Sequence, residues 1–469
     1  MKLNEFEPTK PFEFDGFWQF PDSEDRYYPG RFKSAGNFRF YLSIFGVPVE
    51  MVFTAPHAST GTPYILGLSE HGQEITLIEN YTMNSEFRSN GLGRITFLVG
   101  SAIVGAHISN VDRAKIKSTV VSPRCLGKWA KTIVQLAKNK ASELKIQINK
   151  YIHLLDSNLK GISIGIEGLH NERIEEAGYA VSTRFIPYVR YTFDPYVEIS
   201  AFRKVIYYNE VLFSLLKGDP LHNFKVLIDI ENDGEIANAA YLYTKSGDSS
   251  FGCQSNSSLI LFKPDAAWWT RLFKRWWNLV DELSPAIDLY YLVESKSVPY
   301  IEIQFLNMTT ALEVCHRTHK KISWRERQEH EVRLQVILDA VPAEYREWLR
   351  AKLQYNYEPT LRERIVEIVD FVLTTAPAMR EVFGNRSNIK RFVHQVVETR
   401  NNLVHRGSGG AGRLYKKEDL LELVRFVRLL KLLFKVCIFI HLGLSNGRAG
   451  LLNKIVTSSP DFVFIKSRF

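Results

Sequence analysis

Cysteine is scarce in this chain of 469 residues, and the four that occur lie far apart. They are Cys125, Cys253, Cys315 and Cys437, and no two have the short spacing of a zinc motif. This distribution excludes a disulfide framework and favours reduced thiols in the cores of a cytoplasmic protein. The sequence therefore predicts no bound metal and no other cofactor.

Long apolar runs are also missing. Residues 1–7 lack an apolar signal segment. The apolar run of residues 429–444 is short for a membrane span and contains Lys431 and Lys435. We therefore expect no membrane association, and a buried or interface helix at this run.

Two common catalytic signatures are lacking as well. Gly100 and Gly105 are not followed by the Gly-Lys-Ser/Thr of a phosphate loop, and no dinucleotide fingerprint is present. The first 300 residues contain no defensible Ser-His-Asp arrangement. We therefore expect the first 300 residues to bind or sense a partner, and expect neither a nucleotide site nor a serine-hydrolase site there.

What is present is apolar and aromatic content, together with an uneven charge. Apolar residues make up 45% and aromatic residues 13%, which excludes disorder and suits two or three domains. The net charge is +9. Residues 301–469 hold 28 Lys and Arg against 18 Asp and Glu, whereas residues 1–300 hold 32 against 33. A nucleic-acid partner for the last third is one interpretation, and a solvated basic surface is the other.

The pattern of residues 1–297 predicts a β-rich domain for binding or sensing. Acidic residues 229–235 suit a turn between strands better than a calcium loop, and Lys-rich residues 115–150 suit a solvated face better than an RNA surface. Paired tryptophans at 268–269 and 276–277 cannot all face one core, which favours packing against another domain or chain, with a ligand-stacking surface as the alternative. Strands are expected at 31–33, 37–45, 64–68, 74–79, 145–149, 161–167, 185–193, 224–230 and 239–243, a strand pair broken at Gly100 and Gly105 within 94–108, helices at 129–144, 201–216 and 266–283, and a polar loop at 255–258.

From residue 298 the pattern becomes helical. The expected helices span 300–318, 324–340, 342–355, 361–374, 388–405 and 418–442, with Pro342 and Pro359 at helix starts. The fold class is therefore α+β, with a β-rich domain over 1–297 and an all-α bundle over 298–469.

The stretch from Glu398 to Gly407 concentrates the reactive side chains of this helical part. Arg400 lies in an apolar stripe, where an unpaired guanidinium is costly, so it must meet a carboxylate, carbonyls, an anion or a subunit cleft. His405 follows Asn401 by one turn. Histidine moves protons near neutral pH and arginine holds phosphate, which suits RNA cleavage. A surface or interface Arg/His pair is the alternative. The stripe consists of Val393, Val396, Val397, Leu403 and Val404.

Residues 400–405, Arg-Asn-Asn-Leu-Val-His, resemble the signature of the HEPN ribonuclease superfamily. Residues 305–317 resemble the first helix of the ApeA-like HEPN branch. Phe14 to Trp18 and Pro29 to Phe32 resemble the β-rich domain that precedes HEPN in ApeA-type anti-phage proteins. This resemblance is specific in the last third of the chain and weaker before it.

The resemblance implies a metal-independent endoribonuclease that acts in abortive infection. His405 would be the general base or acid, Arg400 would stabilise the charge on the phosphorane, and Asn401 would position them. Two motifs would meet across a homodimer or higher oligomer, a phage-derived trigger would act through the β-rich domain, and tRNA or other host or phage RNA would be cut. A non-catalytic HEPN binding or dimerisation module, and a β-domain binder with an oligomerising tail, are the alternatives.

Basic side chains around the motif are the expected RNA contacts. Arg406 and Arg413 flank the Gly-rich segment that follows the motif. Arg425, Arg428, Lys431 and Lys435 recur three or four residues apart on the last long helix and are expected to guide RNA. His316, His394 and His441 are expected to be ordinary helix histidines.

Overall fold

The computed structural model forms two compact units, residues 1–271 and 272–469, which are described here one at a time. No helix in the described part of the chain is long and apolar enough to cross a membrane. The structure describes residues 8–21, 26–48, 62–87, 92–123, 157–159, 161–174, 181–218, 220–221, 223–245, 266–320, 324–405, 417–444 and 449–466.

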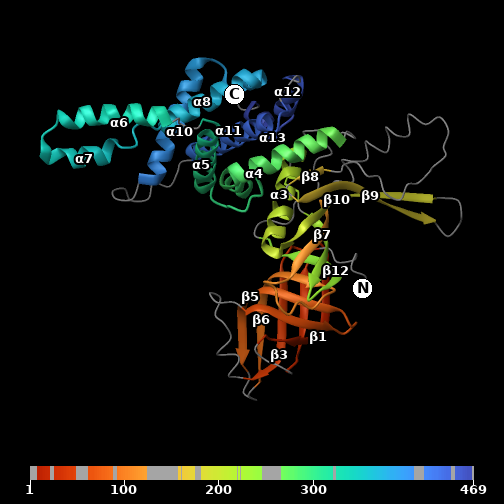
Figure 1. Cartoon of the computed structure of the whole chain (residues 1–469). Coiled ribbons are helices and arrows are strands. Elements are labelled where there is room, and N and C mark those ends of the chain that lie inside the picture. Colours follow the sequence, from red (N-terminus) through yellow and green to blue (C-terminus); the bar gives the residue numbers. More distant parts are fainter. Residues whose placement is uncertain are drawn as a thin grey trace. The chain divides into compact units, whose positions relative to one another are not determined.

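Six antiparallel strands of the first unit close into a barrel (Figure 1). They follow the order β3-β2-β1-β4-β5-β6, and pairing of β3 with β6 joins the two ends. The alternating sequence of β2 places every second side chain inside, and Trp18, Phe32, Phe40 and Phe97 are fully buried in the barrel core. The strands are β1 (Pro11–Gln19), β2 (Tyr28–Ala35), β3 (Phe40–Pro48), β4 (Thr62–Ser69), β5 (Glu74–Phe87) and β6 (Leu92–Val104).

Strand β6 also joins the barrel to a second set of strands. Its residues 92–99 pair with β3, and residues 101–104 pair with β12. The second set follows the order β12-β11-β7-β10-β9-β8 and contains β7 (Lys115–Pro123), β8 (Ser157–Leu159), β9 (Ile162–Ile174), β10 (Val181–Glu198), β11 (Asn223–Asn232) and β12 (Glu235–Tyr243).

The expected break at Gly100 is wrong, because β6 runs through it. A Cβ at Gly100 would lie 2.9 Å from the Cβ of Glu79, so glycine here permits a close approach of two strands. β6 does end before Gly105, which has a φ of +113°, but no second strand follows in 105–108, so the expected strand pair is wrong. The acidic cluster at 229–235 is confirmed as the turn between β11 and β12.

One helix of the first unit, α3 (Ile199–Lys217), packs against β7 and β10. The hydroxyl of Tyr191 donates to Asn209 at 2.6 Å, and Gly218 ends the helix with a φ of +87°. The expected helix at 201–216 is confirmed, and so are the expected strands at 161–167, 185–193, 224–230 and 239–243. The expected helix at 129–144, strand at 145–149 and loop at 255–258 lie outside the described residues.

The second unit is helical, and all six helices expected after residue 298 are confirmed. Helices α5, α8, α10 and α11 pack against one another around apolar side chains such as Phe305, Val369, Val396 and Leu433. The helices are α4 (Ala266–Glu294), α5 (Ile301–His319), α6 (Trp324–Asp339), α7 (Ala343–Leu353), α8 (Leu361–Thr375), α9 (Arg380–Phe383), α10 (Arg386–His405), α11 (Lys417–His441), α12 (Ala449–Thr457) and α13 (Pro460–Lys466), with a 3₁₀ turn η2 (Pro377–Met379).

Helix α4 is longer than expected and lies almost wholly in the second unit. It continues through Pro285 to Glu294, and its later turns bury Ala286, Ile287 and Tyr290. Tyr290 stacks on Phe434 at 5.1 Å between ring centres. This packing offsets the backbone hydrogen bond that proline removes. Trp269 and Trp276, seven residues apart, are the fully buried members of the two tryptophan pairs.

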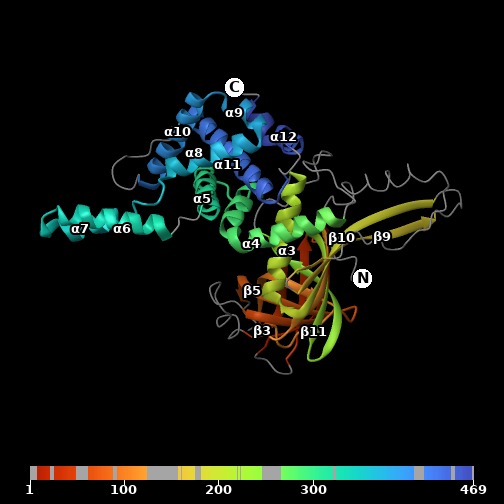
Figure 2. The ribbon, with the colours of Figure 1, turned by 45° about the horizontal axis from the view of Figure 1, so that its top comes forward.

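Helices α6 and α7 form a hairpin, which we call the arm, that projects from the other helices of its unit (Figures 1 and 2). Leu334 and Leu338 are its buried side chains among the described residues, and α7 buries none. Val332 and Trp348 are 67% and 61% exposed.

Candidate active site

The motif is at the end of helix α10, which starts after Asn385. The side chain of Asn385 accepts a hydrogen bond from the backbone N–H of Asn388, as an N-terminal cap does. Val393 and Val396 are buried against the bundle, whereas Val404 is 49% exposed. The apolar stripe therefore packs against the bundle along the middle of the helix, whereas the last turn lies at the surface.

Arg400 lies where the buried stripe gives way to the exposed turn. It is half-buried, and its Nη1 donates to Oδ1 of Asn401 at 3.5 Å. This long bond is the one hydrogen bond that Arg400 makes to the described residues, so most of its donors have no partner within that part of the chain. The structure thus brings Arg400 and Asn401 together, and the residues it describes include none of the carboxylate or carbonyl partners considered for this arginine.

His405 is the last residue of α10, and its side chain lies outside the described part of the structure. Arg406 and Arg413 lie outside it altogether. Asn401 and His405 are four residues apart in the helix and therefore follow each other along one side. The arrangement of all three motif residues about a reacting phosphate stays a prediction.

Of the basic side chains on α11, two face inward. Lys435 is 2% exposed and lies 2.8 Å from Glu294 and 3.4 Å from Asp461, and Lys431 lies 2.6 Å from Glu294. The expectation that Lys431 and Lys435 guide RNA is therefore wrong. Carboxylates that are distant in sequence, on α4 and α13, neutralise them in the interior.

Arg425 and Arg428 differ from these lysines. Arg428 lies over the ring of Phe464 at 3.9 Å and 3.8 Å from Asp461, so its guanidinium is already engaged. Arg425 is half-buried, and burial lowers its pKa although Glu422 opposes the change. Contact of Arg425 and Arg428 with RNA stays a prediction.

A cluster that sequence reasoning did not single out lies between α5, α8 and α11. His316 is buried, and its Nε2 lies 2.9 Å from Glu367, which also meets Lys320. With Cys315, His319, Phe371, Cys437 and His441, these residues line a pocket of about 320 Å³. The spacing Cys-His-x-x-His in α5 and Cys-x-x-x-His in α11 was the available signal, because each set lies on one side of its helix.

The two thiols of this pocket, Cys315 and Cys437, are free and buried. A hydrogen bond from Cys437 lowers the pKa of Cys315 to about 6 against the effect of burial, and His441 assists. Within the described residues, no group of side chains has the geometry of a metal site.

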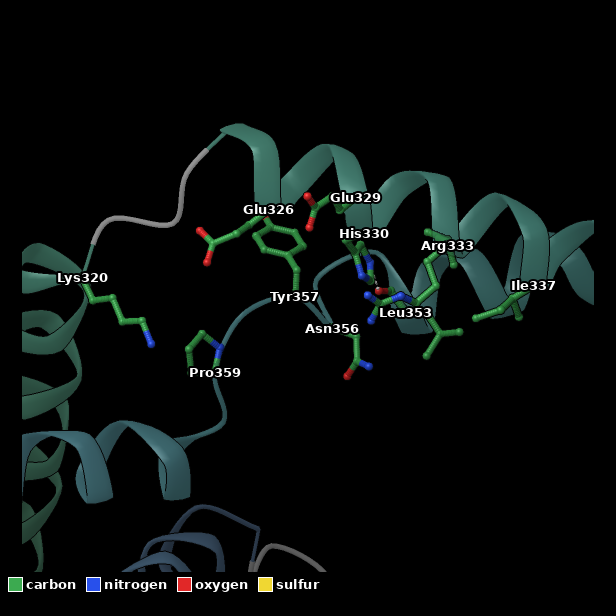
Figure 3. A pocket seen from close by; sticks show the side chains of 11 residues that line it. Lys320, Glu326, Glu329, His330, Arg333, Ile337, Leu353, Asn356, Tyr357 and Pro359 are labelled. Atoms are coloured by element: carbon green, nitrogen blue, oxygen red, sulfur yellow. Dashed lines mark hydrogen bonds between the residues drawn. The ribbon is translucent and has the colours of Figure 1, made fainter. Parts of the chain in front are cut away.

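A wider pocket of about 580 Å³ lies at the base of the arm (Figure 3). His330 meets the carbonyl of Leu353 there at 3.0 Å, and Arg333, Asn356 and Tyr357 line the same hollow. Neither Arg400 nor Asn401 is among its described lining residues. Size alone therefore does not identify the reactive site of this unit.

Comparison with protein families divides the chain as the fold does. The model described as ApeA N-terminal domain 1 matches residues 13–276, which is more than half of the chain, and the model described as Apea-like HEPN matches residues 306–448. No curated protein and no solved structure matches the chain. The second match includes α5, α8, α10 and α11 and therefore the whole Arg400–His405 motif. The β-rich part with its barrel and the bundle that carries the motif together show that this chain belongs to the ApeA family and that its helical part is an ApeA-like HEPN domain.

Proposed function

We propose that this chain is a metal-independent endoribonuclease of the HEPN type that acts in anti-phage defence by abortive infection. The observation that supports this most is Arg400. Among the described residues its half-buried guanidinium has one long bond, to Asn401, at an exposed helix end inside the ApeA-like HEPN match. Such a group is suited to bind a phosphate through charge-assisted hydrogen bonds.

The proposed reaction is attack of a ribose 2′-oxygen on the adjacent phosphorus. A His405 side chain removes the 2′ proton as the new O–P bond forms, and the bond from phosphorus to the 5′-oxygen breaks. A protonated His405 returns a proton to the leaving 5′-oxygen. Arg400 stabilises the added negative charge, and Asn401 orients Arg400. The products are a 2′,3′-cyclic phosphate and a 5′-hydroxyl.

Two copies of the motif are needed for this arrangement. Residues five apart in an α-helix lie about 140° apart around its axis. Arg400 and His405 of one α10 therefore diverge, which favours a composite site in which a second chain supplies the complementary groups. A homodimer is the smallest assembly that supplies them.

The remaining parts of the proposal concern substrate and control. Arg406, Arg413, Arg425 and Arg428 guide the RNA backbone towards the site in the cytoplasm. The β-rich unit senses a phage-derived trigger and releases the nuclease. The RNA that is cut belongs to the host or the phage, tRNA included.

The test is cleavage of end-labelled total RNA in EDTA by the wild type, His405→Ala and His394→Ala. His394 is an exposed histidine on the same helix, which makes it a matched control. We expect cyclic-phosphate ends from the wild type and the control, and a loss of at least about 100-fold for His405→Ala. All three proteins should have the same oligomeric mass.

Equal cleavage by the wild type and His405→Ala would contradict the proposal. If none cleaves, the assay is repeated in extract from phage-infected cells, which supplies a trigger. Continued inactivity there, with RNA binding retained, would favour a binding module.

A further inference from the structure

A third pocket of the helical unit adjoins the motif helix itself. It lies between α9, the first half of α10 and α11, and has a volume of about 420 Å³. Its walls include the buried rings of Phe383, Phe392 and Phe426, with centres 5.5 Å and 6.0 Å apart in successive pairs. The volume is within the range of pockets that hold small organic ligands.

The rim of this pocket is polar and held in position. Arg391 donates to Oδ1 of Asn388 at 2.6 Å, and Gln395 donates to Oε1 of Glu422 at 2.8 Å. Within the described residues, the amide nitrogen of Asn388 and the second carboxylate oxygen of Glu422 make no further hydrogen bond. A ligand in this pocket would therefore find one fixed donor and one fixed acceptor.

The charged side chains at the rim favour a ligand that carries both a phosphate and a nucleobase. Arg391 and Arg425 are the cationic groups among the described lining residues, and the guanidinium of Arg391 suits a phosphate. The carboxylate of Glu422 needs donors. Among the RNA bases, guanine presents two adjacent N–H donors on its Watson–Crick edge, and its O6 and N7 accept from an amide such as that of Asn388.

The position along α10 relates this pocket to the motif. Arg391 precedes Arg400 by nine residues, which is about 13 Å of helix. Asn388, Gln395 and Asn402 are spaced by seven residues and share one side of the helix. Arg391 and Arg400 lie about 180° apart around the axis of α10, so an RNA strand held at Arg400 would pass around the helix to reach the pocket.

We propose that the pocket between α9, α10 and α11 binds one unpaired guanine of the RNA strand, with Glu422 as the residue that selects the base and Arg391 as a contact to its phosphate. This inference rests on the proposed RNA substrate and adds a sequence preference to it. Unstacked bases are the usual targets of sequence-specific RNA recognition.

The test measures binding, so that it does not depend on cleavage. Full-length His405→Ala protein is titrated in EDTA into fluorescein-labelled hexauridylate, and into the same oligonucleotide with one guanine or one adenine. We expect the guanine strand to bind about tenfold more tightly than the other two. Adding Glu422→Gln, which keeps the shape and the bond from Gln395, should remove this preference. Adding Arg391→Ala should weaken the binding of all three oligonucleotides by the same factor.

Glu347→Gln, an exposed carboxylate on α7, is the matched control and should leave the preference unchanged. Equal binding of the three strands, absence of binding, or a preference that survives Glu422→Gln would overturn the inference. Free 5′-GMP that competes as strongly as the guanine strand would show a nucleotide site instead of an RNA site. Cleavage by the wild type is scored separately, so failure of the nuclease proposal remains distinguishable.

Discussion

Glu294 is the buried carboxylate that neutralises two lysines in the interior of the helical unit. It meets both Lys431 and Lys435, and Asp461 completes the group on the other side. Removing one partner of a buried ion pair leaves an uncompensated charge, which costs far more than removing a surface partner. The cluster thus explains why an apolar run could contain two lysines.

Glu294→Gln should lower the free energy of unfolding by roughly 3–5 kcal/mol, because two buried ammonium groups would share Asp461 alone. Urea denaturation followed by circular dichroism measures this change. Glu381→Gln removes an exposed carboxylate bound to Lys466 and should cost at most about 1 kcal/mol. Equal losses for the two variants would contradict the role assigned to the cluster.

The same residue predicts a dependence on pH. Burial raises the pKa of Glu294, but Lys431 and Lys435 outweigh burial and lower it to about 2, from an ordinary value of 4.5. Because the folded pKa is lower, this stabilisation is complete above pH 4.5 and is lost as the pH falls towards 2. The stability difference between wild type and Glu294→Gln should shrink over that range. A constant difference in urea titrations at successive pH values would argue against it.

At the scale of elements, helix α8 shows how local sequence fixes a boundary. Thr360 accepts from the backbone N–H of Glu363, and the Glu363 carboxylate accepts from that of Thr360, which forms a capping box. Arg364 then bonds to the carbonyl of Pro359 and to Glu358. These contacts hold the first turn of α8 in the bundle.

Thr360→Ala should cost about 1 kcal/mol of stability, since it removes the cap of a helix that packs on α5, α10 and α11. Thermal unfolding measures this effect. Thr374→Ala, near the other end of α8, removes only a bond to the carbonyl of Asp370 and serves as control. Equal melting temperatures for Thr360→Ala and Thr374→Ala would show that the cap does not stabilise the helix.

Elements were predictable where the signal is local. Apolar spacing located six of the helices after residue 298, and the Arg400–His405 motif with them, but not the short helices α9, α12 and α13. Contacts between distant residues were not predictable. Nothing near Lys435 indicates Glu294, and nothing in 37–45 indicates that β3 would close the barrel on β6. Helix α4 passes Pro285 for the same reason, because tertiary packing outweighs a local breaker.

For the whole molecule, the central question is whether one chain carries half of a site. If two motifs form each site, excess His405→Ala protein should inactivate the wild type by forming mixed dimers. Cleavage should then fall well below that of the same amount of wild type alone. The pair is mixed under conditions that allow subunit exchange, and mass photometry verifies the dimers. Unchanged cleavage would show that each chain acts alone.

The arm has a consequence for how the helical unit opens. Helix α7 buries no side chain, and α6 buries Leu334 and Leu338, whereas α5 and α11 are enclosed by the bundle. Local opening free energy follows buried apolar contact, so amide hydrogens of the arm should exchange with solvent long before those of α5 and α11. The arm can therefore unfold and refold many times during the lifetime of a folded bundle, and a protease would cut it first.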